Sequence, residues 1–104
     1  LGPGEDQDPI ICGPLAIDLF RHAVTRSGAA VHLTPKEFAV LAELARHAGR
    51  VLSHRHLLRA VWGPAHEDHI DYLRVAIRAL RQKLEDDPAT PALILNEPAV
   101  GYRL

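Results

Sequence analysis

The chain has 104 residues, which is enough for one domain with a single modest core. Its composition, 47% hydrophobic and 24% charged, is typical of a globular protein and unlike that of a disordered chain. No apolar run approaches the roughly 20 residues of a membrane-spanning helix, so we expect no membrane segment. The net charge of −1 gives no global indication of a nucleic-acid partner.

The first nine residues, LGPGEDQDP, contain glycine, proline and acid and almost nothing to bury. We expect residues 1–9 to be a linker or a cloning remnant and residues 10–104 to form the domain. With no methionine and no basic-then-apolar leader, the chain is expected to be a fragment without a secretion signal. The single cysteine, Cys12, follows two isoleucines and is expected to be a small buried residue in a reducing cytosol.

Residues 10–33 predict four short strands of an antiparallel sheet. After IIC and a Gly13-Pro14 turn, Leu15, Ile17 and Leu19 recur at every second position, the period of a strand with one buried face. The next two stretches, AVTR and AAVHL, are joined by Ser27-Gly28, which is typical of a hairpin.

Two short helices are predicted next. Thr34-Pro35-Lys36-Glu37 is a capping box with proline at the first helical position, and Gly49 marks the end. "RVL" predicts a short strand before Ser53, which caps a second helix that ends at Gly63-Pro64. The predicted inward residues of the two helices are Phe38, Leu41, Leu44 and Ala45, then Leu57, Leu58, Val61 and Trp62.

The longest predicted helix, HIDYLRVAIRALRQKLE, covers residues 69–85. At 100° per residue its inward residues fall within about 80° of one another. Between His69 and Leu84 it carries four basic side chains and one acidic side chain, so positive charge is concentrated here despite the overall balance. The inward set is Ile70, Leu73, Ile77, Leu80 and Leu84, and the outward set includes Asp71, Val75, Arg78, Ala79 and Gln82.

The last stretch, LILNEPAVGYRL, predicts a terminal hairpin. The order is therefore sheet, helix, short strand, helix, helix, hairpin. This order predicts an α+β winged helix-turn-helix: an N-terminal four-stranded antiparallel sheet, three helices and a C-terminal β-hairpin wing. In such a fold the third helix lies in the DNA major groove.

Three separated blocks, LTPKEFAVLAELARHAGRVLSHRHLLRAVWG, LRQKLEDDP and GYRL, resemble the DNA-binding effector domain of OmpR/PhoB-type response regulators. The resemblance covers residues 10–104. It implies a bacterial, cytoplasmic, non-enzymatic transcription factor without a cofactor, which binds direct-repeat promoter DNA as a dimer. DYLRVAIRALRQKLEDDPATP followed by NEPAVGYRL is most similar to regulators of potassium-uptake genes.

The resemblance also implies partners. A receiver domain, phosphorylated through a sensor kinase, should lie upstream of residue 1 and assemble the dimer, whereas the isolated domain is expected to be monomeric. The segment from Gly63 to Asp68 should face RNA polymerase, chiefly through Pro64, Ala65, His66 and Glu67.

On the outward face of the long helix we expect different roles for different side chains. Arg78 is the main candidate for a base or central phosphate contact, while Val75 and Ala79 permit close approach and can meet a thymine methyl. Arg74 and Arg81 lie at the flanks and can reach phosphates or acidic groups of the domain itself. The remaining candidates are Asp71, for a cytosine amino group or a nearby arginine; Tyr72, for a phosphate or for packing; and Gln82.

Backbone contacts are expected at the start of the second helix and in the wing. Free N–H groups there suit phosphate, with Ser53, His54 and Arg55 as the residues involved. Arg103 alternates with Tyr102 and is expected to be exposed. The resemblance also shows two departures: many relatives carry arginine where this chain has Ala79, and often one at the hairpin tip where it has Pro98. Without a cation at the tip we expect no minor-groove insertion by the wing, and we expect a lower affinity for one isolated domain.

The sequence argues against a metal site and against catalysis, and it leaves a protein-binding function open. His66-Glu67-Asp68-His69 with Asp71, and His54 with His56, supply metal donors, but the first pair of histidines straddles a helix start and no cysteine assists, so no metal site is expected. No nucleophile lies in a recognisable catalytic context and there is no glycine-rich phosphate loop. A winged helix that binds only proteins remains open.

Overall fold

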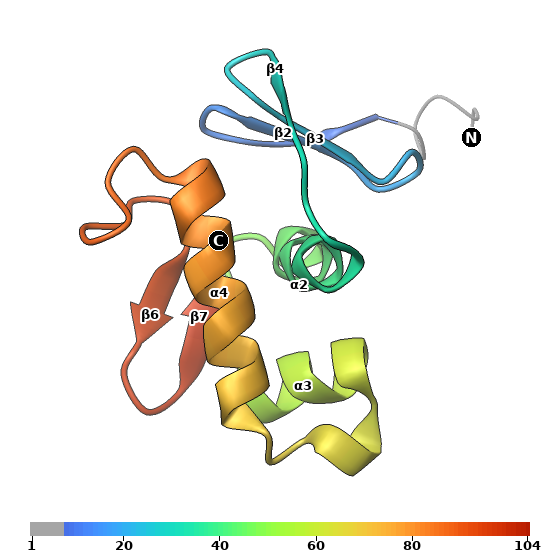
Figure 1. The fold of residues 1–104 in the computed structure, drawn as a ribbon, viewed down its shortest axis with the longest axis vertical. Helices are drawn as coiled ribbons and strands as arrows, with labels where there is room; N and C mark the ends of the chain where they lie inside the picture. The colour runs from blue at the N-terminus through green and yellow to red at the C-terminus, as the bar shows by residue number, and fades with distance from the viewer. Residues whose placement is uncertain (1–7) are drawn as a thin grey trace.

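The computed structural model describes residues 8–104, so most of the expected linker (residues 1–7) lies outside the described residues. The elements follow the predicted order (Figure 1). The N-terminal strands are β1 (Ile10–Cys12), β2 (Leu15–Asp18), β3 (Ala23–Arg26) and β4 (Ala29–Val31). The remaining elements are α2 (Pro35–Arg46), β5 (Leu52–Ser53), α3 (His54–Trp62), the 3-10 turn η1 (Pro64–His66), α4 (Ile70–Leu84), β6 (Leu95–Glu97) and β7 (Gly101–Arg103).

The N-terminal strands form one antiparallel sheet in the order β1-β2-β3-β4. Leu15 and Ile17 are buried, as their alternation predicts, and Ile17 pairs with Val24. β2 ends one residue before Leu19, because Asp18 accepts a hydrogen bond from the Arg21 N–H and begins a turn. The sheet is therefore confirmed, with strands shorter than expected.

Cys12 lies at the edge of this sheet and is only partly buried. The expectation of full burial is thus only partly met, because β1 is an edge strand. Burial nevertheless raises the pKa of the Cys12 thiol, which favours the neutral form.

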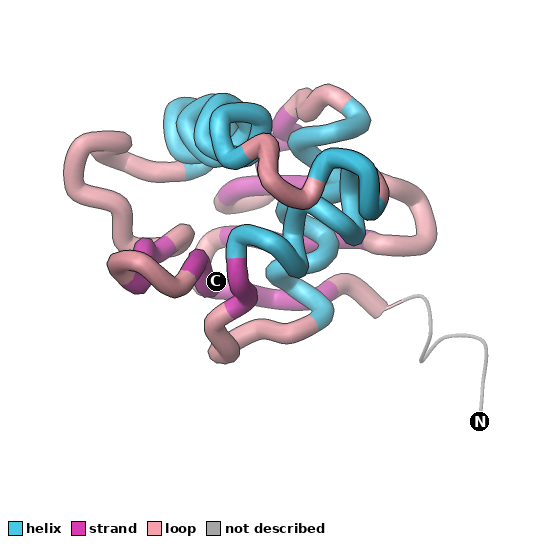
Figure 2. Tube along the Cα trace, turned by 90° about the horizontal axis from the view of Figure 1, so that it is seen from below, coloured by secondary structure: helices cyan, strands magenta, loops and turns pink. Residues whose placement is uncertain are grey.

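Helix α2 lies between the N-terminal sheet and α3 (Figure 1). Its capping box is complete, because the Glu37 N–H donates to Thr34 Oγ1 at 3.3 Å and the Thr34 N–H donates to Glu37 Oε1 at 3.1 Å. The three helices lie close to one another (Figure 2), and their apolar stripes meet in one core. The core side chains from the helices include Phe38, Leu41, Leu44, Leu57, Leu58, Leu73, Ile77, Leu80 and Leu84.

Three predicted inward residues of the helices are not fully buried, and one of them, Val61, is partly buried near the end of α3. Ile70 is 37% exposed, because it is the first residue of α4 and little protein covers that turn. Trp62 is partly buried at the last position of α3, where its ring lies 5.7 Å from Lys36 Nζ and 6.0 Å from the Tyr72 ring. The three predictions of burial were therefore too strong, because residues at helix ends lie at the rim of the core.

The C-terminal hairpin is part of a three-stranded sheet in the order β5-β7-β6. Leu52 pairs with Tyr102, which attaches the hairpin to the start of α3. Gly101 permits this attachment, because a Cβ at that position would lie 1.8 Å from the carbonyl oxygen of Leu52. The wing is thus anchored through a contact that only glycine allows.

A buried carboxylate orders the segment between α4 and the hairpin. Glu85 is 7% exposed and accepts hydrogen bonds from the N–H groups of Ala92, Leu93 and Ile94. These bonds fix where the chain turns back toward β6. Within residues 8–104, no helix is long and apolar enough to cross a bilayer.

Candidate nucleic-acid interface

The outward face of α4 is exposed over its whole length. Val75 is 70% exposed, and Asp71, Arg74, Arg78 and Gln82 are exposed as well. Ala79, also on this side, is only partly exposed. An exposed aliphatic side chain such as Val75 among polar and cationic groups is compatible with a helix that enters a groove, where apolar groups can contact a thymine methyl.

The cations of α4 divide into those held by the protein and those left free. Arg81 donates from Nε (3.3 Å) and Nη2 (3.0 Å) to the carbonyl oxygen of Ile94, and its guanidinium lies 5.7 Å from the Tyr102 ring. Lys83 Nζ lies 2.6 Å from Glu37 Oε1. Part of the positive charge that the sequence predicts on α4 is therefore bound by groups of the domain itself: Lys83 by a carboxylate and Arg81 by a backbone carbonyl.

Arg74 and Arg78 remain available. Neither takes part in any ion pair formed within residues 8–104. Together with Arg81 they line a depression of about 480 Å³ between α4 and the C-terminal segment. The other residues of its wall are Ile77, Gln82, Pro88, Ala89 and Tyr102. Sequence patterns did not predict that Pro88 and Ala89 line this depression, because these residues follow α4 in an irregular segment.

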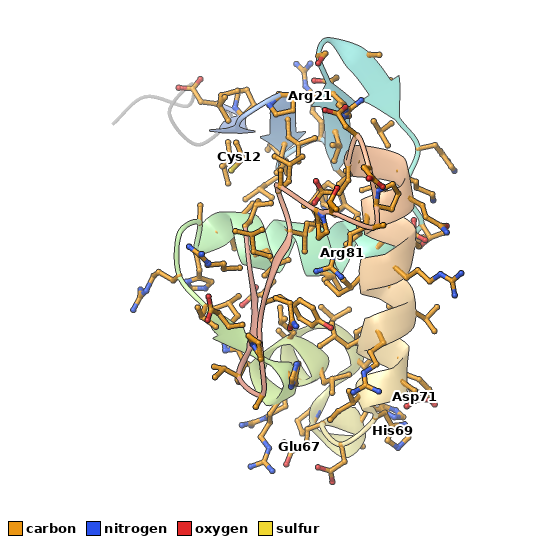
Figure 3. All side chains as sticks on the ribbon, turned by 90° about the vertical axis from the view of Figure 1, so that its left-hand side faces the viewer. Cys12, Arg21, Glu67, His69, Asp71 and Arg81 are labelled. Atoms are coloured by element: carbon orange, nitrogen blue, oxygen red, sulfur yellow. The ribbon has the colours of Figure 1, made fainter. Side chains whose placement is uncertain are left out.

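Tyr72 and Asp71 occupy the first turn of α4. The Tyr72 ring is 39% exposed and lies 4.7 Å from the ring of His69 and 5.9 Å from that of His66. It therefore packs in an aromatic group and still reaches the surface. The exposed Asp71 lies beside His69 at the same end of the helix (Figure 3).

The start of α3 lies next to the wing. Ser53 Oγ accepts from the His56 N–H at 3.0 Å, so the predicted cap is present. The His54 ring lies 5.5 Å from the Tyr102 ring and is partly buried, whereas Arg55 is exposed. Residues 53–55 line a second depression of about 250 Å³, which they share with Glu67, Asp68, Ile70 and Val100. Val100, which is 54% exposed, is a surface residue of the wing that the sequence did not single out.

Arg103 is less free than expected. Its side chain is 40% exposed, and its Nε lies 3.7 Å from Glu97 Oε1 across the hairpin. Alternation placed the residue on the correct side of β7, but it could not reveal the pairing partner on β6.

The segment from Gly63 to Asp68 is more structured than a loop, because residues 64–66 form η1. Pro64 and Ala65 are exposed, while His66 and Glu67 are partly buried. Glu67 lies 3.3 Å from Arg59 Nε and 3.9 Å from Arg55 Nε, so α3 holds this segment in place.

Two carboxylates behind the interface have shifted pKa values. Burial alone would raise the pKa of Glu37, but hydrogen bonds from Lys83 and the Thr34 N–H hold it below its ordinary value. Burial also tends to raise the pKa of Glu43, but its contacts with His56 and Arg46 outweigh this effect. The pKa of Glu43 is therefore lowered as well.

The structure brings together a different set of possible metal donors from those noted in the sequence. The His66 and His69 rings lie 5.1 Å apart, but within residues 8–104 the group of three ligand-type side chains with suitable spacing is Glu43, His47 and His56. Of these three, sequence reasoning had considered only His56.

The fold and this face define a class: a winged-helix DNA-binding domain. The family model "Transcriptional regulatory protein, C terminal" matches residues 28–104. The chain belongs to this family, the DNA-binding effector domains of OmpR/PhoB response regulators.

Individual relatives agree. The chain is 45% identical over 97 residues to the KDP operon transcriptional regulatory protein KdpE of Escherichia coli, covering 92% of this chain and 43% of that protein. It is 44% identical over 100 residues to KdpE of Mycobacterium tuberculosis, covering 95% of this chain and 44% of that protein. The chain thus spans less than half the length of these relatives.

Among solved structures, the Klebsiella pneumoniae RstA DNA-binding domain in complex with RstA box superposes with a TM-score of 0.81 at 35% identity. The match covers 91% of this chain and 94% of that chain. The response regulator DrrB of Thermotoga maritima, an OmpR/PhoB homolog, gives a TM-score of 0.77 at 35% identity, covering 89% of this chain and 42% of that chain. The winged-helix prediction is therefore confirmed.

Proposed function

We propose that α4 enters the major groove of promoter DNA with its outward face against the bases. The observation that carries this proposal is the pair Arg74 and Arg78, which lie one turn apart beside the exposed Val75. Both arginines are exposed and make no ion pair within the described part of the chain. In this arrangement Arg78 contacts a guanine edge or a central phosphate. Val75 and Ala79 meet thymine methyl groups, and Gln82 and Asp71 contact base edges further along the helix.

The depression lined by Arg74, Arg78 and Arg81 is the proposed position of a backbone phosphate. Arg74 supplies the free charge, while Arg81 has one nitrogen beyond its two bonds to Ile94 with which to add a contact. Tyr72 adds a hydroxyl at the other end of the helix. Phosphate contacts of this kind fix the register of the helix and carry no sequence information themselves.

The second depression is the proposed position of another phosphate, at the start of α3. Backbone N–H groups, Arg55 and His54 are the groups that approach it, and Ser53 fixes the helix end. The wing contributes the apolar Val100 here and Arg103 further along β7. Since Pro98 occupies the turn of the hairpin, the wing is proposed to lie on the backbone without entering the minor groove.

The whole protein is proposed to be a regulator of potassium-uptake genes, on the basis of the 44–45% identity to KdpE proteins. A receiver domain upstream, phosphorylated through a sensor kinase, would pair two copies on direct-repeat sites in the cytoplasm. Pro64, Ala65, His66 and Glu67 would then face RNA polymerase, and the proposed DNA contacts require neither catalysis nor a cofactor.

The proposal is tested by selecting duplexes from a random library with the 104-residue chain and titrating binding against salt. Log affinity should fall by about 0.9 per log unit of salt for each phosphate neutralised. Arg21, an exposed arginine at the far end of the molecule from Asp71, provides the matched control Arg21→Ala (Figure 3). Failure to select any duplex, with a flat salt response, would favour a protein-binding winged helix.

A further inference from the structure

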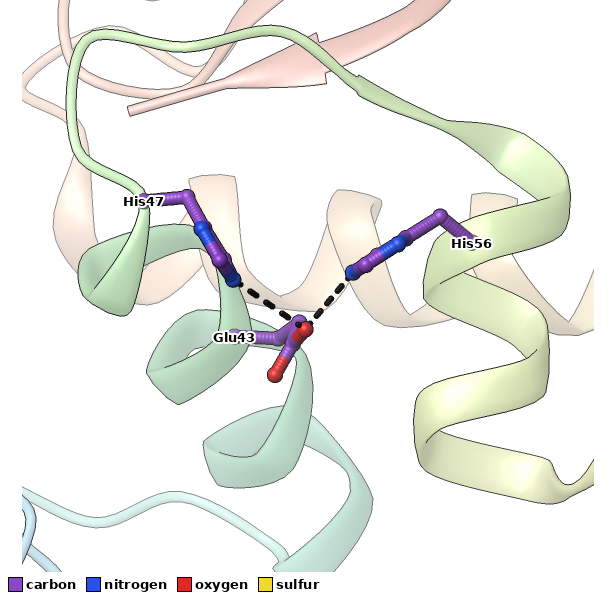
Figure 4. Close-up of side chains that lie close together, drawn as sticks. All are labelled: Glu43, His47 and His56. Carbon is purple, nitrogen blue, oxygen red and sulfur yellow. Dashed lines mark hydrogen bonds and ion pairs between the residues drawn. The ribbon is translucent and has the colours of Figure 1, made fainter.

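Two histidines from different parts of the chain converge on one carboxylate (Figure 4). His56 Nε2 lies 2.6 Å from Glu43 Oε2, and His47 Nε2 lies 3.6 Å from the same oxygen. One possible ligand atom from each residue lies within 4.8 Å of the other two. Imidazole nitrogen and carboxylate oxygen are the donors of many protein zinc sites.

The backbone, and not only the side-chain contacts, holds these residues in position. Glu43 and His47 are four residues apart at the end of α2, so they lie on one face. The His47 N–H closes the helix on the carbonyls of Leu44 and Ala45, and the His56 N–H donates to Ser53 Oγ. The three donors are therefore brought together by two helix ends that form without a metal.

The exposure of these side chains and the orientation of the carboxylate also fit a bound ion. The side chains of His47 and His56 are 37% and 44% exposed, and that of Glu43 is 15% exposed. Arg46 Nη1 lies 3.2 Å from Glu43 Oε1, which leaves Oε2 as the oxygen that faces both imidazoles. Arg46 would thus orient the carboxylate from behind, as groups outside the ligand shell commonly do.

We propose that Glu43, His47 and His56 bind a divalent transition-metal ion of the Zn²⁺ type. Ligand distances of about 2.0–2.2 Å around a tetrahedral ion put neighbouring donors roughly 3.3 Å apart. His56 would therefore move away from Glu43 by less than about 1 Å, and His47 would move slightly closer. Two imidazoles disfavour Ca²⁺ and Mg²⁺, and water would occupy the fourth position. The bound ion would link the end of α2 to the start of α3.

The test uses the 104-residue chain stripped of metal with a chelator, with Zn²⁺ and Co²⁺ as probes. Zn²⁺ should raise the Tm, because an ion that binds only the folded state stabilises it. Co²⁺ should give the visible absorption of a tetrahedral site. His56→Ala and His47→Gln should each weaken Zn²⁺ binding by at least about tenfold. Loss of a residue outside the ligand shell already costs about that much, and loss of a ligand should cost no less.

The matched control is the double variant His66→Ala/His69→Ala, which removes the other neighbouring pair of imidazoles. It should bind Zn²⁺ like the unmodified chain. His47→Gln covers the case in which His56→Ala fails to fold, because the helix end at position 47 is closed by backbone atoms. No Zn²⁺ effect on the unmodified chain, equal binding by both single variants, or loss of binding in the double variant would each overturn the proposal.

Discussion

The guanidinium of Arg81 donates two hydrogen bonds to the carbonyl oxygen of Ile94, at 3.3 Å from Nε and 3.0 Å from Nη2. The N–H of the same Ile94 donates to the buried Glu85 at 2.8 Å. The backbone carbonyl and the backbone N–H of Ile94 are therefore both held by side chains at the end of α4. Arg81 is consequently a structural residue of the wing as well as a lining residue of the cationic depression.

Arg81→Ala should therefore lower the free energy of unfolding by about 1–3 kcal/mol, the usual effect of removing a charged hydrogen-bond partner. Urea unfolding followed by circular dichroism measures this. Arg78→Ala, one turn earlier on the same helix, should change stability by less than about 0.5 kcal/mol because it removes no internal bond. Equal stabilities of the two variants would show that the Ile94 contact contributes nothing.

Arg78→Ala should instead weaken binding to a selected duplex by about 1–3 kcal/mol and relax preference at one base position. Arg74→Ala should weaken binding to all duplexes alike and reduce the salt slope by about one unit. Fluorescence anisotropy with labelled duplexes measures both, with Arg21→Ala as the control. Affinity unchanged by Arg78→Ala would remove this residue from the contact surface.

Gly101→Ala should destabilise the domain by about 1–3 kcal/mol, the usual effect of forcing extra volume into a packed site. The added methyl would collide with the carbonyl oxygen of Leu52, so β5 and β7 would have to separate. Thermal unfolding is the measurement, and Val100→Ala, at the exposed neighbouring position, is the control. A Tm for Gly101→Ala equal to that of the control would show that β5 and β7 can adjust without loss.

Stability should decline in acid partly through Glu37. Its pKa is lowered in the folded state, so the unfolded chain takes up a proton first as the pH falls below the ordinary value of 4.5. The stabilisation is thus fully present above that value and is lost as the pH falls through the folded-state pKa. Glu37→Gln keeps an oxygen for the Thr34 N–H but loses the charge facing Lys83, so it should be less stable at neutral pH and show a shallower acid decline. Identical pH profiles would exclude this contribution.

Sequence patterns were sufficient to predict the fold because the signals that start and end its helices and strands are local. The capping box at Thr34 and Glu37, the cap at Ser53 and the alternation of Leu15 and Ile17 each depend on residues close in the chain. Periodicity also identified the outward face of α4. It overestimated burial at Trp62 and Ile70, because a helical period does not reveal where the packing partner ends.

The side-chain partners could not be predicted, because they join segments distant in sequence. Lys83 contacts Glu37, which lies 46 residues away in the sequence. Arg81 donates to a backbone carbonyl, and every residue type has such a group, so the sequence does not indicate which one is the partner. The convergence of Glu43 with His56 depends on how α2 and α3 cross. Composition alone therefore overestimated how much of the positive charge of α4 is free to meet DNA.

The most direct measurement is an amide NMR titration of the 104-residue chain with a selected duplex. Chemical-shift changes should be largest at Arg74, Val75, Arg78 and Gln82 and smaller at the start of α3 and in the wing. They should be absent from the exposed Ile11 of β1 and the exposed Phe20 in the turn between β2 and β3. Changes centred on that sheet, with α4 unaffected, would contradict the assignment of α4 as the DNA-contacting helix.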